Sequence, residues 1–351
     1  MTDLEGIARC LELARKAEGR TAPNPIVGGV VVDRRGKIVG EGFHRGPGTP
    51  HGEAEALAKA GAKAKGGTLY VNLEPCDHRD GGRIPCSQRV IESGVARVVI
   101  GAMDPIPGHA GGAKRIARAK IRVTKGVLRE ACEDANAAFF TWATQGRPRF
   151  ILKAAITLDG KIATAGGESQ WITSEAARAH GRRLRGKVDA ILVGVGTVLA
   201  DDPKLTARTR GAKDPVRIVL DGSLRTPASA AMLAEPGRTI IVTREKAREL
   251  RGAELWRMDP IELVALAKRL GEAKMTSVLV EGGAETHARF LAAGLADELR
   301  VYVAPIAVGG AARSWVGGAG VATLAEAYRF EYAGAPEMIG GDLVVRLRRT
   351  R

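Results

Sequence analysis

The sequence predicts an α/β protein with two domains. Segments with apolar residues at helical spacing alternate with short runs rich in Val, Ile and Leu along the chain. Such alternation is typical of layered α/β folds. The length of 351 residues suits two domains of ordinary size. Gly and Pro in the polar stretch 145–148 separate two patterned regions, so we expect domains at 1–146 and 147–351.

The first region is predicted to contain helices and strands in alternation, including one hairpin. Asp33 to Gly36 is a turn sequence between two apolar runs, which predicts that hairpin. The expected elements are an amphipathic helix at 4–18, strands at 26–32 and 37–43, a helix at 51–60, a strand at 68–73, a helix beginning at Pro75 and a strand at 96–102.

The second region opens with a strand at 150–156 and is expected to alternate strands and helices to its end. Further strands are predicted at 188–193, 216–220, 239–242, 277–280 and 299–304. Gly194 and Gly196 are not followed by a third Gly at Leu199, so the Rossmann fingerprint is absent. Glu281-Gly282-Gly283 joins a strand to a helix, where small residues let a phosphate approach the helix N-terminus. An ordinary strand-to-helix turn explains the same motif.

The composition is that of a soluble globular protein, with 45% hydrophobic and 26% charged residues. No apolar run has the length of a membrane helix, and the acidic N-terminus lacks the features of a signal peptide, so we expect a cytoplasmic protein. The net charge of +15 is not gathered into a dense basic tail. A generally basic surface is the favoured interpretation, nucleic-acid binding is the alternative, and a phosphorylated substrate or cofactor also suits the excess of cations.

His51, Glu53, Cys76 and Cys86 form the strongest functional motif. One His and two Cys ligands leave a fourth zinc position open, as in catalytic zinc sites. A Glu two residues from the His is the proton carrier of zinc deaminases and does not ligate the metal. We therefore predict hydrolytic removal of an amine, with Glu53 moving protons. A helix beginning at Pro75 would favour a thiolate at Cys76.

The interval between the two Cys residues separates this chain from nucleic-acid deaminases, which generally have Cys-x-x-Cys. Here nine residues intervene, and they include His78 and Arg83. This insertion is either a loop that holds a ring and a phosphate or a solvated loop. The other two cysteines, Cys10 and Cys132, lie in helical patterns and are expected to be buried thiols.

The chain resembles the bifunctional pyrimidine deaminase/reductases of riboflavin biosynthesis over nearly its full length. The matching motifs in the first region are Pro23-Asn24-Pro25, Gly40-Glu41-Gly42-Phe43-His44, Pro50-His51-Gly52-Glu53 and Leu73-Glu74-Pro75-Cys76. Those in the second are Thr157-Leu158-Asp159-Gly160, the run 167–174, the run 197–203 with Leu205, Thr206 and Arg208, Glu281-Gly282-Gly283, and Tyr302-Val303-Ala304-Pro305.

The resemblance implies a cytidine-deaminase-like α/β/α domain followed by a dihydrofolate-reductase-like α/β domain. It implies zinc-dependent deamination of 2,5-diamino-6-ribosylamino-4(3H)-pyrimidinone 5′-phosphate, and then NADPH-dependent reduction of the ribosyl group to ribityl. It also implies a homo-oligomer with a small phosphorylated substrate and no nucleic-acid or membrane partner. Two alternatives stay open: only one activity is retained, or the chain is a basic nucleic-acid-binding or editing deaminase.

The resemblance also implies roles for individual residues. His51, Cys76 and Cys86 would hold zinc, and Glu53 would move protons. The residues expected to bind substrate are Asn24, His44, His78, Arg83, Ser169, Arg185, Leu205, Arg208 and Glu281. Those expected to bind NADPH are Ala155, Trp171, Thr197, Asp201, Ser223, Gly283, Ala284, Glu285, Thr286, His287, Ala288 and Arg289.

The chain departs from the family pattern at three places. Gly52 stands where Ala is usual between the His and the Glu. The interval from Cys76 to Cys86 is one residue longer than is common, which affects the placement of Arg83. The family often shows Asp-Ser after the strand at 216–220, whereas this chain has Asp221-Gly222-Ser223.

Overall fold

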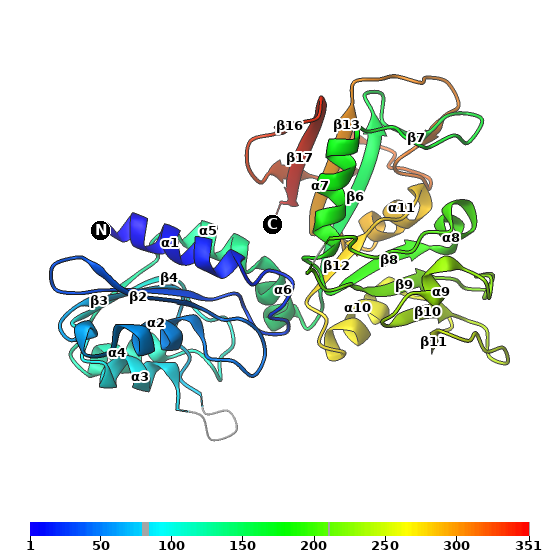
Figure 1. The fold of residues 1–351 in the computed structure, drawn as a ribbon. Coiled ribbons are helices and arrows are strands. Elements are labelled where there is room, and N and C mark those ends of the chain that lie inside the picture. The colour runs from blue at the N-terminus through cyan, green and yellow to red at the C-terminus, as the bar shows by residue number, and fades with distance from the viewer. Residues whose placement is uncertain (79–83, 210, 351) are drawn as a thin grey trace. The chain divides into compact units, whose positions relative to one another are not determined.

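The chain forms two compact units in a computed structural model that describes residues 1–78, 84–209 and 211–350. Unit 1 spans Met1–Gly146 and unit 2 spans Arg147–Arg351 (Figure 1). The division falls in the stretch at 145–148, where Gly146 has a φ of 67° and ends a helix. Each unit buries hydrophobic clusters of its own.

Unit 1 is a three-layer α/β/α domain built on one five-stranded sheet. The strand order is β2-β1-β3-β4-β5, in which β2-β1-β3 are antiparallel and β3-β4-β5 are parallel. Its elements are α1 (Asp3–Arg15), β1 (Gly28–Val32), β2 (Ile38–Phe43), α2 (Gly52–Ala60), η1 (Gly61–Ala64), β3 (Thr68–Leu73), α3 (Cys86–Glu92), β4 (Arg97–Ala102), α4 (Gly112–Arg118), β5 (Arg122–Lys125), α5 (Arg129–Ala135) and α6 (Ala137–Gln145).

Helices cover both faces of this sheet, so its central strands are apolar on both sides. α1 and α5 lie over one face, and α2, α3 and α4 lie over the other (Figure 1). Every residue of β1 is buried, and β3 and β4 are buried over all but their first residue. Cys10 in α1 and Cys132 in α5 are fully buried, which confirms that they belong to the core.

Two glycines let α2 approach β1 closely and thereby place Glu53. A Cβ on Gly29 would lie 2.8 Å from the Cα of Glu53, and a Cβ on Gly52 would lie 2.4 Å from the carbonyl oxygen of Val27. Real side chains do not tolerate such contacts with backbone atoms. A Cβ at position 52 would therefore force this helix start and the end of the segment before β1 to move apart.

The predicted helix at Pro75 is wrong, because the next helix is α3 and it begins at Cys86. The buried carboxylate of Glu74 accepts hydrogen bonds from the backbone N–H groups of Ala113 at 2.9 Å and Gly111 at 3.2 Å. These bonds tie the chain after β3 to the start of α4 and hold it as a loop. Pro85 precedes the first residue of α3, so the proline that marks a helix start is Pro85 and not Pro75.

Unit 2 is a larger α/β domain. It contains a ten-stranded sheet with the path β11-β10-β9-β8-β12-β6-β13-β17-β15, and β16 pairs with β17. Its elements are β6 (Arg149–Thr157), β7 (Lys161–Ala163), α7 (Glu175–Arg185), β8 (Ala190–Gly194), α8 (Val195–Asp201), β9 (Val216–Leu220), α9 (Ala231–Ala234), β10 (Thr239–Thr243), β11 (Glu254–Arg257), α10 (Leu263–Glu272), β12 (Ser277–Val280), α11 (Ala284–Ala292), β13 (Glu298–Ala304), β14 (Arg313–Ser314), η2 (Leu324–Glu326), β15 (Phe330–Tyr332), β16 (Glu337–Ile339) and β17 (Asp342–Arg349).

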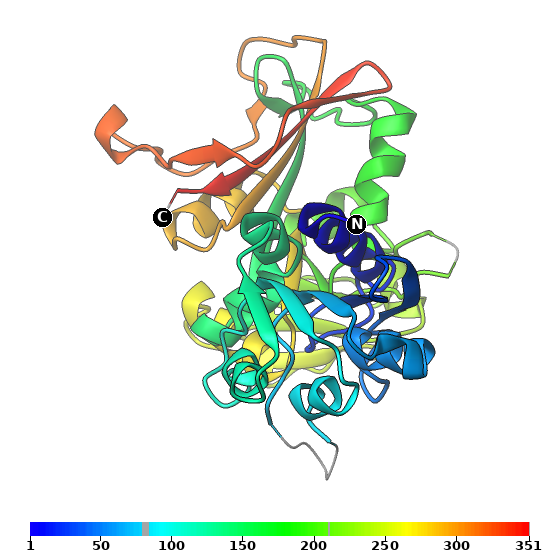
Figure 2. The ribbon, with the colours of Figure 1, turned by 90° about the vertical axis from the view of Figure 1, so that its left-hand side faces the viewer.

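The sheet of unit 2 is parallel from β11 to β13 and antiparallel beyond it. β17 pairs with β13 at six positions. The two strands lie side by side in Figure 2, where β17 is red and β13 is orange. After β13, the described part of the chain forms strands, loops and one short 3-10 helix. The expected alternation of strands and helices to the end of the chain is therefore wrong after residue 304. The parallel strands end toward one edge, where loops and helix starts gather.

A buried carboxylate joins three strands of this sheet. Glu298 in β13 is 2% exposed and contacts Arg300 at 2.6 Å, Arg346 at 3.0 Å and Arg149 at 3.3 Å. Burial alone would raise the pKa of Glu298, but the three guanidinium groups hold it at about 2. The unperturbed value is 4.5, so ionised Glu298 stabilises the folded unit at neutral pH.

Replacing Glu298 by Gln is expected to lower the free energy of unfolding of unit 2 by about 3 kcal/mol at pH 7. Because the folded pKa lies below the unfolded one, this contribution is complete above pH 4.5 and is lost as the pH falls through about 2. Urea unfolding at pH 7 and near pH 2 measures it. Glu331→Gln, in an exposed pair with Arg348, is the control and should cost less than about 1 kcal/mol. A loss for Glu298→Gln that does not change with pH contradicts this account.

Candidate active sites

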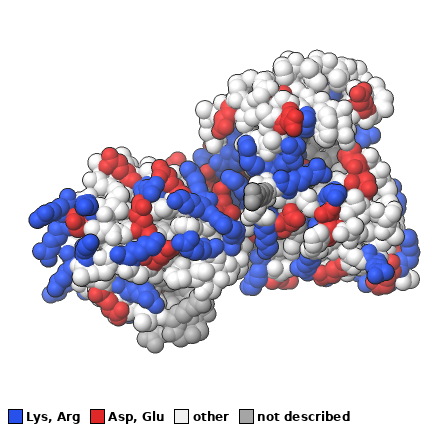
Figure 3. Space-filling model, viewed as in Figure 1, with Lys and Arg blue, Asp and Glu red and all other residues white. Residues whose placement is uncertain are grey.

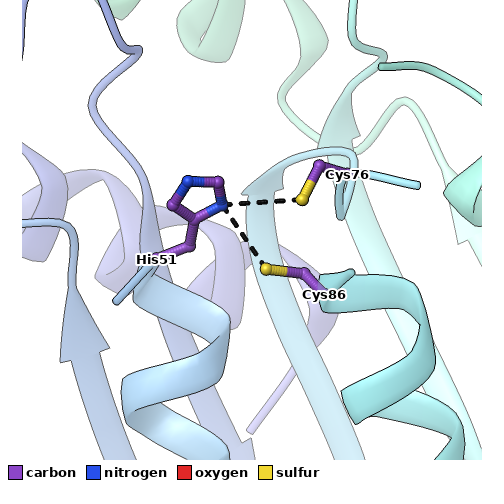
Figure 4. Close-up of side chains that lie close together, drawn as sticks. All are labelled: His51, Cys76 and Cys86. Atoms are coloured by element: carbon purple, nitrogen blue, oxygen red, sulfur yellow. Dashed lines mark hydrogen bonds between the residues drawn. The ribbon is translucent and has the colours of Figure 1, made fainter. Parts of the chain in front are cut away.

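His51, Cys76 and Cys86 converge at one point of unit 1 (Figure 4). His51 is the residue before α2, Cys76 lies in the loop after β3, and Cys86 is the first residue of α3. The Nδ1 atom of His51 lies 3.4 Å from the Sγ of Cys86 and 3.7 Å from the Sγ of Cys76. All three ligand atoms lie within 4.8 Å of one another.

These separations fit a tetrahedral zinc ion. Zinc bound to a His nitrogen and a Cys sulfur at their usual bond lengths separates the two atoms by about 3.5 Å. The observed nitrogen-to-sulfur distances lie on either side of that value. One nitrogen and two sulfurs supply three ligands, which leaves a fourth position for a water or a substrate group.

The two sulfurs share a negative charge. The hydrogen bond from Cys86 lowers the pKa of Cys76, and the same contact raises the pKa of Cys86. A thiolate is therefore present at neutral pH, which is the form that binds metal. This charge does not come from a helix beginning at Pro75, as the sequence suggested. It comes from the neighbouring thiol and from His51.

Glu53 lies beside this cluster and is 2% exposed. Its Oε1 atom lies 3.9 Å from Nδ1 of His51, while its Oε2 atom is buried and has no hydrogen-bond partner among the described residues. Burial raises the pKa of Glu53, although His51 opposes the shift. A buried carboxylate oxygen without a partner is costly unless it serves a ligand or a reaction. The position fits a group that exchanges a proton with a molecule bound at the cluster.

Two further predicted residues line the same neighbourhood. The side-chain amide of Asn24 lies 3.1 Å from Nε2 of His44, and the carbonyl oxygen of Pro50 lies 3.1 Å from Nδ1. The rings of His44 and His51 meet edge to face with centroids 5.1 Å apart. The structure thus brings Asn24 and His44 next to the His that belongs to the metal cluster.

His78 stacks on a residue that the sequence did not indicate. The rings of His78 and His109 are 3.7 Å apart at their centroids and 8° from parallel. Nδ1 of His78 is buried and has no hydrogen-bond partner within the described ranges. The predicted phosphate ligand Arg83 lies outside the described residues. Asp104 is a further addition: burial raises the pKa of its carboxyl, and His109 acts against that shift.

Unit 2 contains a cavity of about 1220 Å³. It lies along the ends of β6, β8, β9 and β12 and beside the start of α11. Twelve predicted site residues line it: Ala155, Ser169, Thr197, Asp201, Ser223, Glu281, Gly283, Ala284, Glu285, Thr286, His287 and Arg289. A volume of this size accommodates a dinucleotide or a cofactor together with a small substrate.

Five predicted residues of unit 2 are not part of the cavity wall: Trp171, Arg185, Leu205, Arg208 and Ala288. Leu205 is 1% exposed and its side chain packs in the hydrophobic core. Trp171 is exposed, with the guanidinium of Arg178 4.4 Å from its ring centroid. Arg208 is exposed as well. The side chains of Leu205, Trp171 and Arg208 therefore lie outside the cavity wall that the twelve lining residues form.

Arg185 reaches the cavity indirectly, through an ion pair with Glu281. Its Nε and Nη2 atoms each donate to a carboxylate oxygen of Glu281 at 2.9 Å. Burial would raise the pKa of Glu281, but Arg185 and Lys153 hold it at about 2. Glu281 is thus a fixed negative charge in the cavity wall. The paired geometry also fixes the direction of its carboxylate.

The start of α11 is open toward the cavity. Gly283 is the residue before the helix. Among the residues that the structure describes, no side chain caps the helix, and a Cβ on Gly283 would meet no atom within 4 Å. The first N–H groups of a helix attract phosphate, and a Gly at this place lets it come close. The backbone at Gly282-Gly283 is compatible with a phosphate site and with an ordinary strand-to-helix turn. Only a phosphate site accounts for the cavity beside it.

Lys153, Arg225 and Arg244 also line the cavity, although no motif of the sequence indicated them. Lys153 had a detectable signal, because it is the one charged residue within the apolar run 150–156. It lies two residues from Ala155 on the same face of β6. Arg225 and Arg244 follow different strands, β9 and β10, and no local pattern joins them.

The surface is broadly basic and carries no single basic stripe on the face seen in Figure 3, where acidic side chains are interspersed among the Lys and Arg side chains. This distribution fits a generally basic surface better than a nucleic-acid groove. Within the part of the chain that the structure describes, no helix has the length and apolar character needed to cross a membrane.

Both units match known protein families. Residues 1–102 match the family described as the cytidine and deoxycytidylate deaminase zinc-binding region. Residues 148–338 match the RibD C-terminal domain. The two matched regions fall in unit 1 and unit 2.

Full-length relatives and solved structures show the same arrangement. The riboflavin biosynthesis protein RibD of Aquifex aeolicus is 43% identical over 97% of this chain and 96% of its own length. That of Escherichia coli is 40% identical over 95% of each chain. The structure of a diaminohydroxyphosphoribosylaminopyrimidine deaminase/5-amino-6-(5-phosphoribosylamino)uracil reductase from Thermotoga maritima superimposes with a TM-score of 0.92, at 35% identity and with 99% of each chain covered. Acinetobacter baumannii RibD gives a TM-score of 0.90 at 34% identity, again over 99% of each chain.

Proposed function

We propose, given that this chain belongs to the RibD family of bifunctional deaminase/reductases of riboflavin biosynthesis, that its two sites act in sequence on one pyrimidine. Unit 1 deaminates 2,5-diamino-6-ribosylamino-4(3H)-pyrimidinone 5′-phosphate. Unit 2 then reduces the ribosyl group of 5-amino-6-(5-phosphoribosylamino)uracil to ribityl with NADPH. The name of the Thermotoga maritima relative, which specifies both activities, supports these substrates.

The observation that carries the deaminase proposal is the His51–Cys76–Cys86 cluster with the unpaired carboxylate oxygen of Glu53 beside it. Zinc held by these three residues would supply a water that is acidic near neutral pH. Glu53 would accept one proton of that water and pass it to the ring nitrogen, and would then carry the remaining hydroxyl proton to the departing amine. The carbon gains an oxygen from water and loses its nitrogen as ammonia.

The residues around the cluster hold the pyrimidine. Asn24 and His44 are linked to each other, so each fixes the direction of the other's polar group toward the ring. His78, stacked on His109, offers a flat surface and an unpaired Nδ1 at the other side. Arg83 is proposed to bind the substrate phosphate on the strength of the family resemblance alone.

In unit 2, the cavity fits NADPH and a substrate side by side. NADPH supplies a hydride when bound. The open start of α11 at Gly283 would bind the cofactor's pyrophosphate, and Ala155, Thr197, Asp201 and Ser223 would line its path. Trp171 and Ala288 lie next to the cavity-lining segments but are not part of the cavity wall, and we propose that they contact the cofactor from its edge.

The substrate would lie near the Glu281–Arg185 pair, where the carboxylate can accept hydrogen bonds from ribose hydroxyls. Ser169 lines the same cavity. Leu205 and Arg208 both have positive φ values, of 55° and 50°. Because the Leu205 side chain is buried, it can act only through its backbone, whereas the exposed Arg208 side chain suits a phosphate. We also propose a cytoplasmic homo-oligomer that has no nucleic-acid partner.

One assay separates the two activities. The diaminopyrimidine phosphate is supplied with NADPH, and ammonia release and loss of NADPH absorbance are followed independently. We expect both signals, with ammonia appearing first. Removal of zinc by a strong chelator should abolish ammonia release and leave reduction of separately supplied 5-amino-6-(5-phosphoribosylamino)uracil intact. Ammonia without NADPH oxidation would reduce the assignment to a deaminase, and loss of both reactions on chelation would contradict independent sites.

A further inference from the structure

One end of the unit 2 cavity carries two cations without partners. Arg225 lies in the loop after β9, and Arg244 is the first residue after β10. Both are exposed and both line the cavity, next to Ser223. Across residues 1–78, 84–209 and 211–350, neither guanidinium has a hydrogen bond or an ion pair. Two unpaired cations in one cavity wall favour a bound anion.

The position of Arg244 depends on the loop that precedes Arg225. The backbone N–H of Arg244 donates to the carbonyl oxygen of Gly222 at 3.1 Å. A Cβ on Gly222 would lie 3.2 Å from the Nε of Arg244, so the guanidinium lies directly over the glycine. This glycine is the one in Asp221-Gly222-Ser223, where the family often has Ser. Gly222 leaves room for the Arg244 side chain above the loop.

The sheet order places the start of α11, where a phosphate would bind, between these two cations and the substrate. Gly283 follows β12, β9 lies two strands away from β12, and β10 lies three strands away. Neighbouring strands are about 4.8 Å apart, which gives about 10 to 15 Å. Glu281 directly follows β12, and Lys153 lies in β6, the neighbour of β12 on the side opposite β8. A dinucleotide with its pyrophosphate at Gly283 and its nicotinamide near Lys153 therefore extends its adenosine toward β9 and β10.

We propose that Arg244 binds the 2′-phosphate of NADPH and sets the preference of this chain for NADPH over NADH. Arg225 contributes a second positive charge to the same phosphate. Arg presents several N–H groups in a plane, which suits a phosphate monoester. NADH carries a hydroxyl at that position and gains nothing from the guanidinium. This inference rests on the proposed reductase function and adds a specificity-determining residue to it.

The test is equilibrium binding of NADP⁺ and NAD⁺ to the full-length chain by titration calorimetry, without turnover. Arg244→Ala is expected to raise the Kd for NADP⁺ about 10- to 100-fold and to leave the Kd for NAD⁺ nearly unchanged. Arg244→Lys should retain part of the preference, because it keeps the charge and loses the paired geometry. Lys246→Ala is the matched control, since it removes one charge from the same loop and Lys246 does not line the cavity.

The outcomes separate the possible failures. Weaker binding of both dinucleotides by Arg244→Ala, to the same extent, overturns the proposal and makes Arg244 a structural residue of the loop. An effect of Lys246→Ala as large as that of Arg244→Ala also overturns it, because general surface charge would then explain the preference. If the unvaried chain binds neither dinucleotide while its deaminase acts, the reductase assignment itself fails and this proposal fails with it.

Discussion

Replacing Glu53 by Gln is expected to slow ammonia release about 10²- to 10⁴-fold while zinc stays bound. Gln has the shape of Glu but can neither accept nor return the proton that the reaction moves. The unpaired Oε2 atom and the 3.9 Å separation from His51 place the carboxylate beside the ligands and not among them. Ammonia release and zinc content per chain are measured on the same preparation.

Glu55→Gln is the matched control, since Glu55 lies on the same helix and pairs with Arg45 and Lys59 at 2.9 and 2.8 Å. Glu55→Gln should release ammonia at nearly the rate of the wild-type protein. Reduction of separately supplied 5-amino-6-(5-phosphoribosylamino)uracil should be normal in both variants, because unit 2 contains its own site. Equal loss of zinc and of activity in Glu53→Gln would show that Glu53 ligates the metal, contrary to this account.

The second large effect is expected from Gly283→Val. The backbone of Gly283, with φ of −79° and ψ of −176°, is extended and suits valine. Its Cβ would meet no atom within 4 Å, so the variant should fold. The added methyl groups would occupy the cavity at the start of α11, where the phosphate has to approach the N–H groups. We expect the Kd for NADPH to rise about 100-fold and reduction to fall with it.

A graded series makes this result specific. Gly283→Ala adds one carbon to the same space and should weaken NADPH binding less than Val does. Thermal unfolding should change little in either variant, and ammonia release should be unaffected. Normal NADPH binding by Gly283→Val would mean that the pyrophosphate lies elsewhere, and the simple-turn interpretation of Gly282-Gly283 would then hold.

The sequence revealed the apolar strands and missed those whose residues are polar or charged. β1, β3 and β4 are buried on both faces, so continuous runs of Val, Ile and Leu mark them. β5 reads Arg-Val-Thr-Lys, and β17 alternates apolar residues with Arg after Val345. The strand character of β5 comes from its pairing with β4. The alternation in β17 is a short strand pattern, and pairing with β13 completes it. The false helix at Pro75 has the same origin, because Glu74 is held by residues about 40 positions away.

The metal cluster could be predicted because its residues occur in short, recognisable sequence motifs. His51 and Glu53 are two residues apart, and few sites other than a zinc deaminase combine them with two later cysteines. The cations of the unit 2 cavity could not be predicted in this way. Arg225 and Arg244 come together only because β9 and β10 pair in parallel. His109 likewise reaches His78 through the fold, 31 residues along the chain.

The place of β17 has a consequence for how the protein is made. β17 lies between β13 and β15, yet at residues 342–349 it is synthesised after both of them. On the ribosome, unit 1 has every strand of its sheet by residue 125 and can fold while synthesis continues. Unit 2 cannot cover the edge of β13 until β17 has emerged. A nascent or prematurely terminated chain therefore displays an unpaired strand edge there, a site at which other chains can add and aggregate.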